Sequence, residues 1–410
     1  MTNSDIHTTT IGAVGLNAAT QFQTGVQSLL NATNIIQGFT SLPGGLTFGT
    51  GSTGGSVTYN AIGGIGGTIT LNGTNAFNLS TDLALLSGVT FTGGSCTIAG
   101  NNHALILPNV STPFTFPSAI TTLGSGLDLV LNSPLTLSSS LTFTASNNVI
   151  NGNSHYINFP GTAGIITIAS GAGLTIKNAT LQGVSTGQFV LASSTSSLTL
   201  QNVIWNQDSA VTISTGSLNI LNDVLITGSS TFTYSSTSAL TINSYSTLMF
   251  ELGMTFNYAS SSASELVFTD PSAVLYLNGA NLITGSAGLN LTIGTLEVNN
   301  NSTIASSGTV TIGNNTSGAN DLQVNIFPSA TLSVTQGTLN YSNINASSFQ
   351  MGNYASILSM GNGTTLNLLQ SINNGNGIIA FGNATLGTIS GSNISGSTDV
   401  FGTLSFATAP

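Results

Sequence analysis

Acidic residues are the first candidates for chemistry, because pairs of carboxylates carry out glycoside hydrolysis. Asp208 and Asp223 form one candidate pair, and Glu265 and Asp270, which lies beside Pro271, form another. A glycosidase needs two carboxyl groups that face each other about 5 to 9.5 Å apart. The separation of Asp208 and Asp223 along the chain is shorter than one turn of the repeat described below, so they need not share a face. We expect no catalytic pair among these acids.

Two histidines are the candidates for metal binding. His103 and His155 occupy matching positions of two similar segments, which could place them on one face of a repeating structure. Paired imidazoles can bind a transition metal. Since no third ligand accompanies them at a recognisable spacing, we expect both to be turn residues that form local hydrogen bonds. The sequence therefore predicts no metal site and no cofactor.

Lys177 is the only Lys or Arg of the chain, and Trp205 is the only Trp. Lys177 occupies an alternate position in the run 175–178, which predicts an outward, solvated side chain. Trp205 could stack on a carbohydrate, but we expect it to fill the core or to pack on the surface. Cys96 is the only cysteine, so no intramolecular disulfide framework is available. We expect Cys96 to be a small, buried hydrophobic residue. No catalytic residue is assigned.

The chain has very few charges: one basic and eleven acidic residues among 410. Average proteins are about one-quarter charged. Enzymes that act on anions, sugar acids or nucleotides use cations that this chain lacks, and a basic nucleic-acid footprint is excluded. No window approaches the roughly 18 to 20 consecutive apolar residues of a spanning helix. The hydrophobic content of 40% argues against disorder and predicts a large core.

Short runs of alternating apolar and polar residues continue from about residue 46 to the end of the chain. Runs of this kind, separated by Gly, Asn and Ser, are typical of strands and turns. The middle runs begin at positions 174, 198, 218 and 240, which are nearly evenly spaced. A recurrence of this kind indicates a solenoid, here with a coil of roughly 22 residues.

A longer self-match relates two earlier segments. Positions 98–108 recur as 150–160, and positions 89–92 recur as 141–144, with the same offset. In a solenoid coil of three short strands, each strand pairs in parallel with its equivalents in the coils above and below. Inward residues then stack into a continuous apolar column, and rows of Ser, Thr and Asn cover the outside without charges.

The turns at 100–103 (Gly-Asn-Asn-His) and 152–155 (Gly-Asn-Ser-His) resemble those of right-handed parallel β-helix proteins. The segments 174–181 and 198–205 are similar to strand-turn-strand units of the pectin-lyase-like superfamily. This resemblance covers residues 65–250 best and implies an architecture more than a function. It also implies turn residues that tolerate the left-handed conformation. The asparagines at that position are Asn178, Asn202 and Asn222.

Residues 1–45 have a different pattern. Apolar residues from Leu16 to Ile36 fall near helical spacing before the breaker Pro43-Gly44-Gly45. They predict an amphipathic helix of about 20 residues, although Gly25 in its middle costs about 1 kcal/mol relative to Ala. We expect this segment either to cap the first coil or to dock on a neighbouring subunit. Residues 46–410 are then the parallel β-helix.

The sequence thus predicts an all-β protein, a right-handed parallel β-helix of about fifteen coils with a short N-terminal helical segment. We do not expect an enzyme. We expect a structural subunit of an extracellular or cell-surface filament, in which copies of the protein stack head to tail. The first alternative is a surface adhesin or secreted passenger β-helix that binds glycans or host matrix. The second is a polysaccharide lyase or hydrolase. Residues 1–40 contain no Lys or Arg, so the positively charged start of a secretory signal is not visible.

Overall fold

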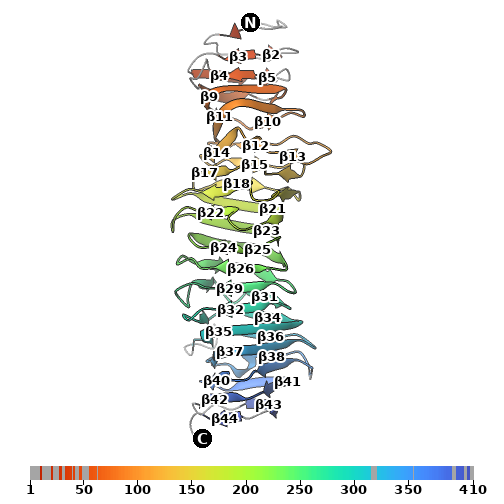
Figure 1. The fold of residues 1–410 in the computed structure, drawn as a ribbon, viewed down its shortest axis with the longest axis vertical. Helices are drawn as coiled ribbons and strands as arrows, with labels where there is room; N and C mark the ends of the chain where they lie inside the picture. Colours follow the sequence, from red (N-terminus) through yellow and green to blue (C-terminus); the bar gives the residue numbers. More distant parts are fainter. Residues whose placement is uncertain are drawn as a thin grey trace. The chain divides into compact units, whose positions relative to one another are not determined.

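The computed structural model describes residues 55–389, apart from 62, 315–320 and 354. Outside that range it describes only strand segments between residues 10 and 48 and between residues 394 and 406. The chain divides into two compact units, residues 1–183 with 187–198 and residues 184–186 with 199–410. Both units are parallel β-solenoids whose strands are labelled in Figure 1.

Three parallel ladders form the first unit. The first ladder contains β7 (Ser56–Ala61), β9 (Thr68–Leu79), β11 (Thr90–Ala99), β14 (Ile120–Gly124), β17 (Leu141–Phe143), β20 (Ile166–Ile168) and β22 (Phe189–Leu191). The second contains β8 (Gly64–Ile65), β10 (Leu83–Leu85), β12 (Ala104–Ile106), β15 (Asp128–Val130), β18 (Asn148–Asn151) and the first half of β21 (Gly173–Val184). The third contains β13 (Phe114–Thr115), β16 (Leu135–Thr136), β19 (Tyr156–Asn158) and the second half of β21.

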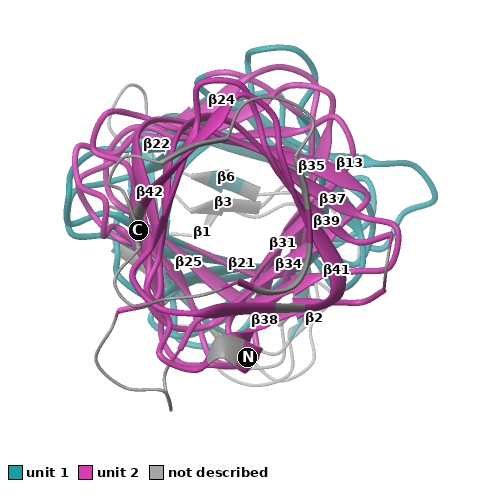
Figure 2. Ribbon diagram, turned by 90° about the horizontal axis from the view of Figure 1, so that it is seen from below, with its two compact units in different colours: residues 1–183, 187–198 teal, residues 184–186, 199–410 magenta. Residues whose placement is uncertain are grey.

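The second unit repeats this arrangement, and its strands (magenta in Figure 2) run around one interior. One ladder contains β24 (Val211–Ile213), β26 (Thr231–Tyr234), β29 (Thr255–Tyr258), β32 (Asn281–Thr284), β35 (Asn301–Ile312), β37 (Thr331–Tyr341), β39 (Ile357–Met360) and β41 (Ile372–Phe381). Another contains β25 (Ser217–Gly228), β28 (Thr247–Phe250), β31 (Val274–Asn278), β34 (Thr295–Asn299), β36 (Gln323–Ile326) and β38 (Phe349–Met351).

A third face of this unit begins with the first half of β25 and continues through β27 (Leu240–Ile242) and β30 (Leu266–Phe268). Further along the chain, β33 (Leu289–Leu291) pairs with the second half of β35, which is followed by β37, β40 (Thr365–Leu368) and β42 (Ala384–Ile389). Every pair whose register is defined is parallel, as the alternating runs predict.

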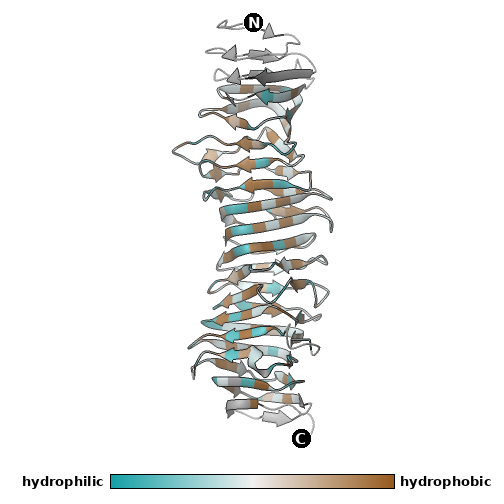
Figure 3. Ribbon diagram, turned by 180° about the vertical axis from the view of Figure 1, so that it is seen from behind, coloured by the Kyte–Doolittle hydropathy of each residue, from teal (hydrophilic) through white to brown (hydrophobic). Residues whose placement is uncertain are grey.

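Alternation of side chains places the core between the ladders. Leu218, Leu240 and Leu266 occupy equivalent positions of successive coils, and each is at most 3% exposed. Apolar and polar positions alternate along the strands in Figure 3. Full burial of one such aliphatic side chain is worth about 1.5 to 3 kcal/mol. The interior is therefore a column of stacked apolar residues, as expected from the sequence.

Aromatic residues fill part of the interior of the second unit. Phe250 and Phe256 stack with ring centroids 4.6 Å apart, and the Trp205 ring meets Phe232 edge-on at 6.0 Å. Trp205 is fully buried. Of the two packing roles expected for Trp205, that of a core residue is thus confirmed.

Coil length varies more than the sequence indicated. Gly64 of β8 pairs with Ala84 of β10, whereas Ser302 of β35 pairs with Leu332 of β37, so the second of these coils is about half as long again as the first. The described part of the chain forms about 13 turns, near the expected number of about fifteen.

The expected N-terminal helix falls on residues most of which lie outside the described part of the chain. Within residues 1–45 only short strands are described, from β1 (Thr10–Ile11) to β5 (Thr40–Ser41). The capping or docking role of this segment therefore stays a prediction. Among the described residues, no helix has the length and apolarity needed to cross a membrane.

Candidate functional site

The structure does not bring Asp208 and Asp223 together into a site. Asp208 is exposed in the turn after β23 (Ser197–Gln207), whereas Asp223 is exposed within β25, next to the left-handed Asn222. Asp223 lines an open groove of about 320 Å³ over β23, β25 and β28, but Asp208 does not line it. The other lining residues are Asn202, Val203, Ile204, Val224, Leu225, Thr247 and Met249.

The second acidic pair flanks a strand. Glu265 precedes β30 and Asp270 follows it in the next turn. Asp270 accepts hydrogen bonds from the backbone N–H of Ser272 at 2.8 Å, from the Ser272 hydroxyl at 2.6 Å and from the Ser244 hydroxyl. The hydrogen bonds from Ser244 and Ser272 lower the pKa of Asp270. Asp270 thus holds a turn in place and links it to the turn of the preceding coil.

Both histidines end tight turns, as expected. Asn101 and Asn102 have φ of 52° and 66°, and the His103 N–H donates to the Gly100 carbonyl at 2.9 Å. Two consecutive left-handed residues are typical of a type I′ turn, which favours Asn and Gly. The turn at 152–155 has the same geometry, with the His155 N–H donating to the Gly152 carbonyl at 2.8 Å.

The two histidines do not share a face, so the possibility raised by their matching positions is not realised. Ile98, before the first turn, pairs with Leu123 in the ladder of β11 and β14, whereas its sequence match Ile150 pairs with Leu129 in the ladder of β15 and β18. In the latter ladder, Leu105, Leu129 and Ile150 occupy equivalent positions of three successive coils. Two coils therefore contain fewer residues here than the offset between the two matching segments. The second copy of the turn motif consequently falls at the next corner of the coil and not at the same corner.

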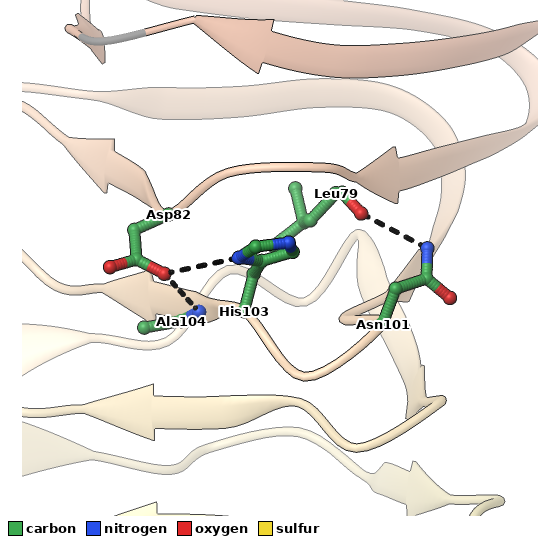
Figure 4. A network of polar contacts seen from close by, with 5 residues as sticks. All are labelled: Leu79, Asp82, Asn101, His103 and Ala104. Atoms are coloured by element: carbon green, nitrogen blue, oxygen red, sulfur yellow. Dashed lines mark hydrogen bonds and ion pairs between the residues drawn. The ribbon is translucent and has the colours of Figure 1, made fainter.

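His103 takes part in a small polar network at the solvent surface (Figure 4). Its Nδ1 lies 3.7 Å from Oδ1 of Asp82, which also accepts the Ala104 N–H at 2.9 Å. The His103 and Asp82 side chains are 36% and 59% exposed, so water weakens their attraction. In the described part of the chain, no group of three His, Cys, Asp or Glu side chains could hold a metal ion.

Lys177 points outward from β21, as expected, and lies directly opposite Asn151 of β18. Its charge acts on Asp128, which belongs to β15, two strands away. Burial raises the pKa of Asp128, the positive charge of Lys177 lowers it, and the negative charge of Asp82 raises it. Oδ1 of Asp128 is buried and has no hydrogen-bond partner among the described residues. Sequence reasoning missed this group because its members come from three coils of unequal length.

A second groove lies over β34, β36 and β38. It has a volume of about 260 Å³ and is lined by Glu297, Asn325, Phe327 and Gln350, among others. The Phe327 ring, which is 37% exposed, lies 6.2 Å from the ring of Tyr276. Amide, carboxylate and aromatic groups on one open surface are the groups with which proteins contact sugars.

Hydroxyl and amide side chains connect successive coils. They donate to backbone carbonyls one coil earlier, so they add to the main-chain ladder bonds without any charge. Examples are Asn132 to Leu107 at 3.2 Å, Ser133 to Pro108 at 2.9 Å, Asn243 to Ile220 at 2.9 Å, Ser302 to Leu277 at 3.1 Å and Ser342 to Ile312 at 3.0 Å.

The predicted asparagine turns are confirmed. Asn178 in the first unit has φ of 52°, and Asn202 and Asn222 in the second unit have φ of 53° and 55°. Asn tolerates this left-handed conformation better than most residues.

Comparison with known proteins identifies no relative of this chain: no protein-family model, no curated protein and no solved structure matches it.

Proposed function

We propose that this protein is a non-enzymatic structural subunit that assembles with copies of itself, coil end to coil end, outside the cell or at its surface. The observation that carries the proposal is the uncharged hydrogen bonding between coils. The coils in the described ladders pair through parallel backbone groups, and Ser and Asn side chains reinforce several of these pairs.

The two edges of a parallel ladder differ from each other, which favours head-to-tail assembly of identical copies. One edge of a coil is not equivalent to the other, so two copies stacked through opposite edges form a heterologous contact. Such a contact leaves both outer edges available again and propagates without closing. Unpaired strand edges are known templates for this kind of pairing.

The charge distribution supports the same assembly. A net charge well away from zero usually keeps identical molecules apart. The formal net charge here is −10 in 410 residues, and the acids described above are dispersed over several turns and faces. Little electrostatic work is therefore needed to bring two copies together.

Electron microscopy and sedimentation at increasing protein concentration test this proposal. We expect filaments or concentration-dependent oligomers that persist from about 0.1 to 1 M salt, since uncharged contacts are insensitive to a Debye length that falls from about 10 to 3 Å. A dispersed monomer at high concentration across that range would overturn the proposal.

A second function is favoured by the two grooves on the ladder from β25 to β38. The exposed Phe327 ring and its neighbour Tyr276, with Glu297, Asn325 and Gln350, suit a glycan-binding adhesin. A glycan array that shows specific binding, lost on Tyr276→Ala, would support it. The polysaccharide lyase or hydrolase alternative has weaker support, because Asp208 does not line the groove that Asp223 lines. Turnover of acidic or neutral polysaccharides would establish it.

A further inference from the structure

The only Lys of the chain lies opposite an asparagine on the outer face of the first unit. Lys177 of β21 is directly opposite Asn151 of β18, and both side chains are on the outer side of the same parallel ladder. Neighbouring strands are about 4.8 Å apart, so the Lys177 side chain is long enough to bring Nζ to the carboxamide of Asn151. A primary amine and a carboxamide can react when the nitrogen and the carbonyl carbon approach to about 3 to 3.5 Å.

An acid lies diagonally across the strand of this carboxamide. Asp128 belongs to β15, which pairs with β18, and β18 in turn pairs with β21. Burial raises the pKa of Asp128 and the positive charge of Lys177 lowers it, so the two groups interact electrostatically across the strand of Asn151. Oδ1 of Asp128 is buried and has no hydrogen-bond partner in the described structure. This carboxyl group can therefore exchange protons without breaking a protein hydrogen bond through that oxygen.

The surroundings of these three residues are partly apolar. Val149 is opposite Asp128, and Val130 is opposite Asn151, both half-buried on the same outer face. Burial raises the pKa of Asp128, which favours its neutral, proton-donating form. The nucleophilic form of Lys is the neutral amine.

The carbonyl group of Asn151 is held in place by its own turn. Oδ1 of Asn151 accepts the backbone N–H of Asn153 at 3.2 Å. A fixed N–H donor to this oxygen also stabilises the negative charge that develops on it when a nucleophile attacks the carbon, as in an oxyanion hole.

We propose that Lys177 and Asn151 form an intramolecular isopeptide bond, with Asp128 as the acid and base. The neutral Nζ of Lys177 attacks Cγ of Asn151. Asp128 accepts a proton from Nζ and delivers one to Nδ2, the Cγ–Nδ2 bond breaks, and ammonia leaves. Asp128 ends in its original state, and no oxidant or other reactant is needed.

The bond would change both the mechanics and the charge of the first unit. It joins two adjacent coils covalently and closes a loop from residue 151 to residue 177. It also converts the only Lys or Arg side chain of the chain into a neutral amide. A covalent cross-link between stacked strands is an advantage in a protein whose strands are otherwise held to one another across coils only by non-covalent contacts.

Trypsin and mass spectrometry provide a direct test on the wild-type chain. Trypsin cleaves after Lys and Arg, so the fully denatured protein has one cleavage site, after Lys177. With the isopeptide bond we expect no cleavage and an intact mass lower by one ammonia. Cleavage into residues 1–177 and 178–410 together with the unmodified mass would overturn the proposal, whatever the behaviour of any variant.

Three variants assign the roles. Asn151→Ala and Asp128→Asn should each restore tryptic cleavage and the unmodified mass. Asn158→Ala is the matched control, because Asn158 is also outward and lies opposite Gln182 in the adjacent ladder. The control should stay resistant to trypsin. Full linkage in Asp128→Asn would overturn the role of Asp128, and full linkage in Asn151→Ala would overturn the choice of Asn151.

Discussion

Two outer faces of this protein differ although the strands beneath them are built alike. In the first unit, the face over β15, β18 and β21 carries Asp128, Asn151 and Lys177. In the second unit, the face over β28, β31, β34 and β36 carries Met249, Tyr276, Glu297 and Asn325 at corresponding positions of successive coils. Inward positions of both ladders are mostly Leu, Ile, Val or Phe. The interior of a solenoid is thus constrained by stacking, while its outer face can take on charge or aromatic groups independently.

The two units also differ in buried tyrosines, and alkaline pH should produce the largest contrast. Burial raises the pKa of Tyr59 in the first unit to about 12, and that of Tyr341 in the second unit to about 12. Burial also raises the pKa of Tyr234 and Tyr258 of the second unit. The folded pKa exceeds the unfolded value of 10.0, so this stability is complete below pH 10 and is lost as pH rises toward 12.

Each such tyrosine lowers the free energy of unfolding by up to about 1.4 kcal/mol per pH unit in that window. In the first unit, burial also raises the pKa of the Cys96 thiol from 9.0 to about 12, which adds a loss of stability that begins at lower pH. The comparison is therefore made in a Cys96→Ala variant, in which the second unit, with its three described buried tyrosines, should unfold at lower pH than the first. Fluorescence of Trp205, which belongs to the second unit, and far-ultraviolet circular dichroism of the whole chain separate the two events. A circular dichroism transition that precedes the Trp205 transition would contradict the comparison.

Truncation of a buried Phe to Ala should lower the free energy of unfolding by about 3 to 5 kcal/mol. We expect this loss only in the unit that carries the substitution. Phe256→Ala removes a stacked ring beside Phe250 in the second unit, and Phe143→Ala removes a fully buried ring in the first. In urea titrations, Phe256→Ala should shift the Trp205 transition and Phe143→Ala should leave it in place. Thr142→Ala, on the outer side of the same strand as Phe143, is the control and should change little. Equal shifts for both Phe variants would show that the units unfold as one.

Turn asparagines should have the same effect in both units. Asn178→Ala and Asn222→Ala place alanine in a left-handed conformation that only Gly and Asn visit routinely, and each should cost about 1 to 2 kcal/mol. The matched variants Asn178→Gly and Asn222→Gly keep the left-handed conformation accessible and should cost less. Urea unfolding measures both. A Gly variant as unstable as its Ala partner would mean that the side-chain amide, and not the backbone conformation, is what the turn requires.

The polar network at Asp82 should contribute least. Its ion pair with His103 is solvent-exposed, and such pairs are worth about 0 to 1 kcal/mol. His103→Asn should therefore shift the urea midpoint of the first unit only slightly and that of the second unit not at all. A loss comparable to that of Phe143→Ala would show that this corner has a structural importance that its exposure does not indicate.

Several features could be predicted from the sequence because they depend on local pattern. Alternation predicted the strands, and the turn position of Asn178 predicted its left-handed backbone. The long self-match was a true repeat of a turn, but it did not place His103 and His155 on one face. A sequence offset reports a common face only when it equals a whole number of coils, and coil length here changes from one turn to the next.

The sequence by itself determined the class of structure: an all-β solenoid with an apolar interior and an outside that has almost no charge. These properties follow from residue types and from the two-residue period of a strand, which need no knowledge of distant contacts. Only the tertiary structure decided which outward residues become neighbours. Asp128, Asn151 and Lys177 lie on three successive strands of one ladder. The loops between these strands differ in length, so the register that aligns the three residues is set by the packing of whole coils.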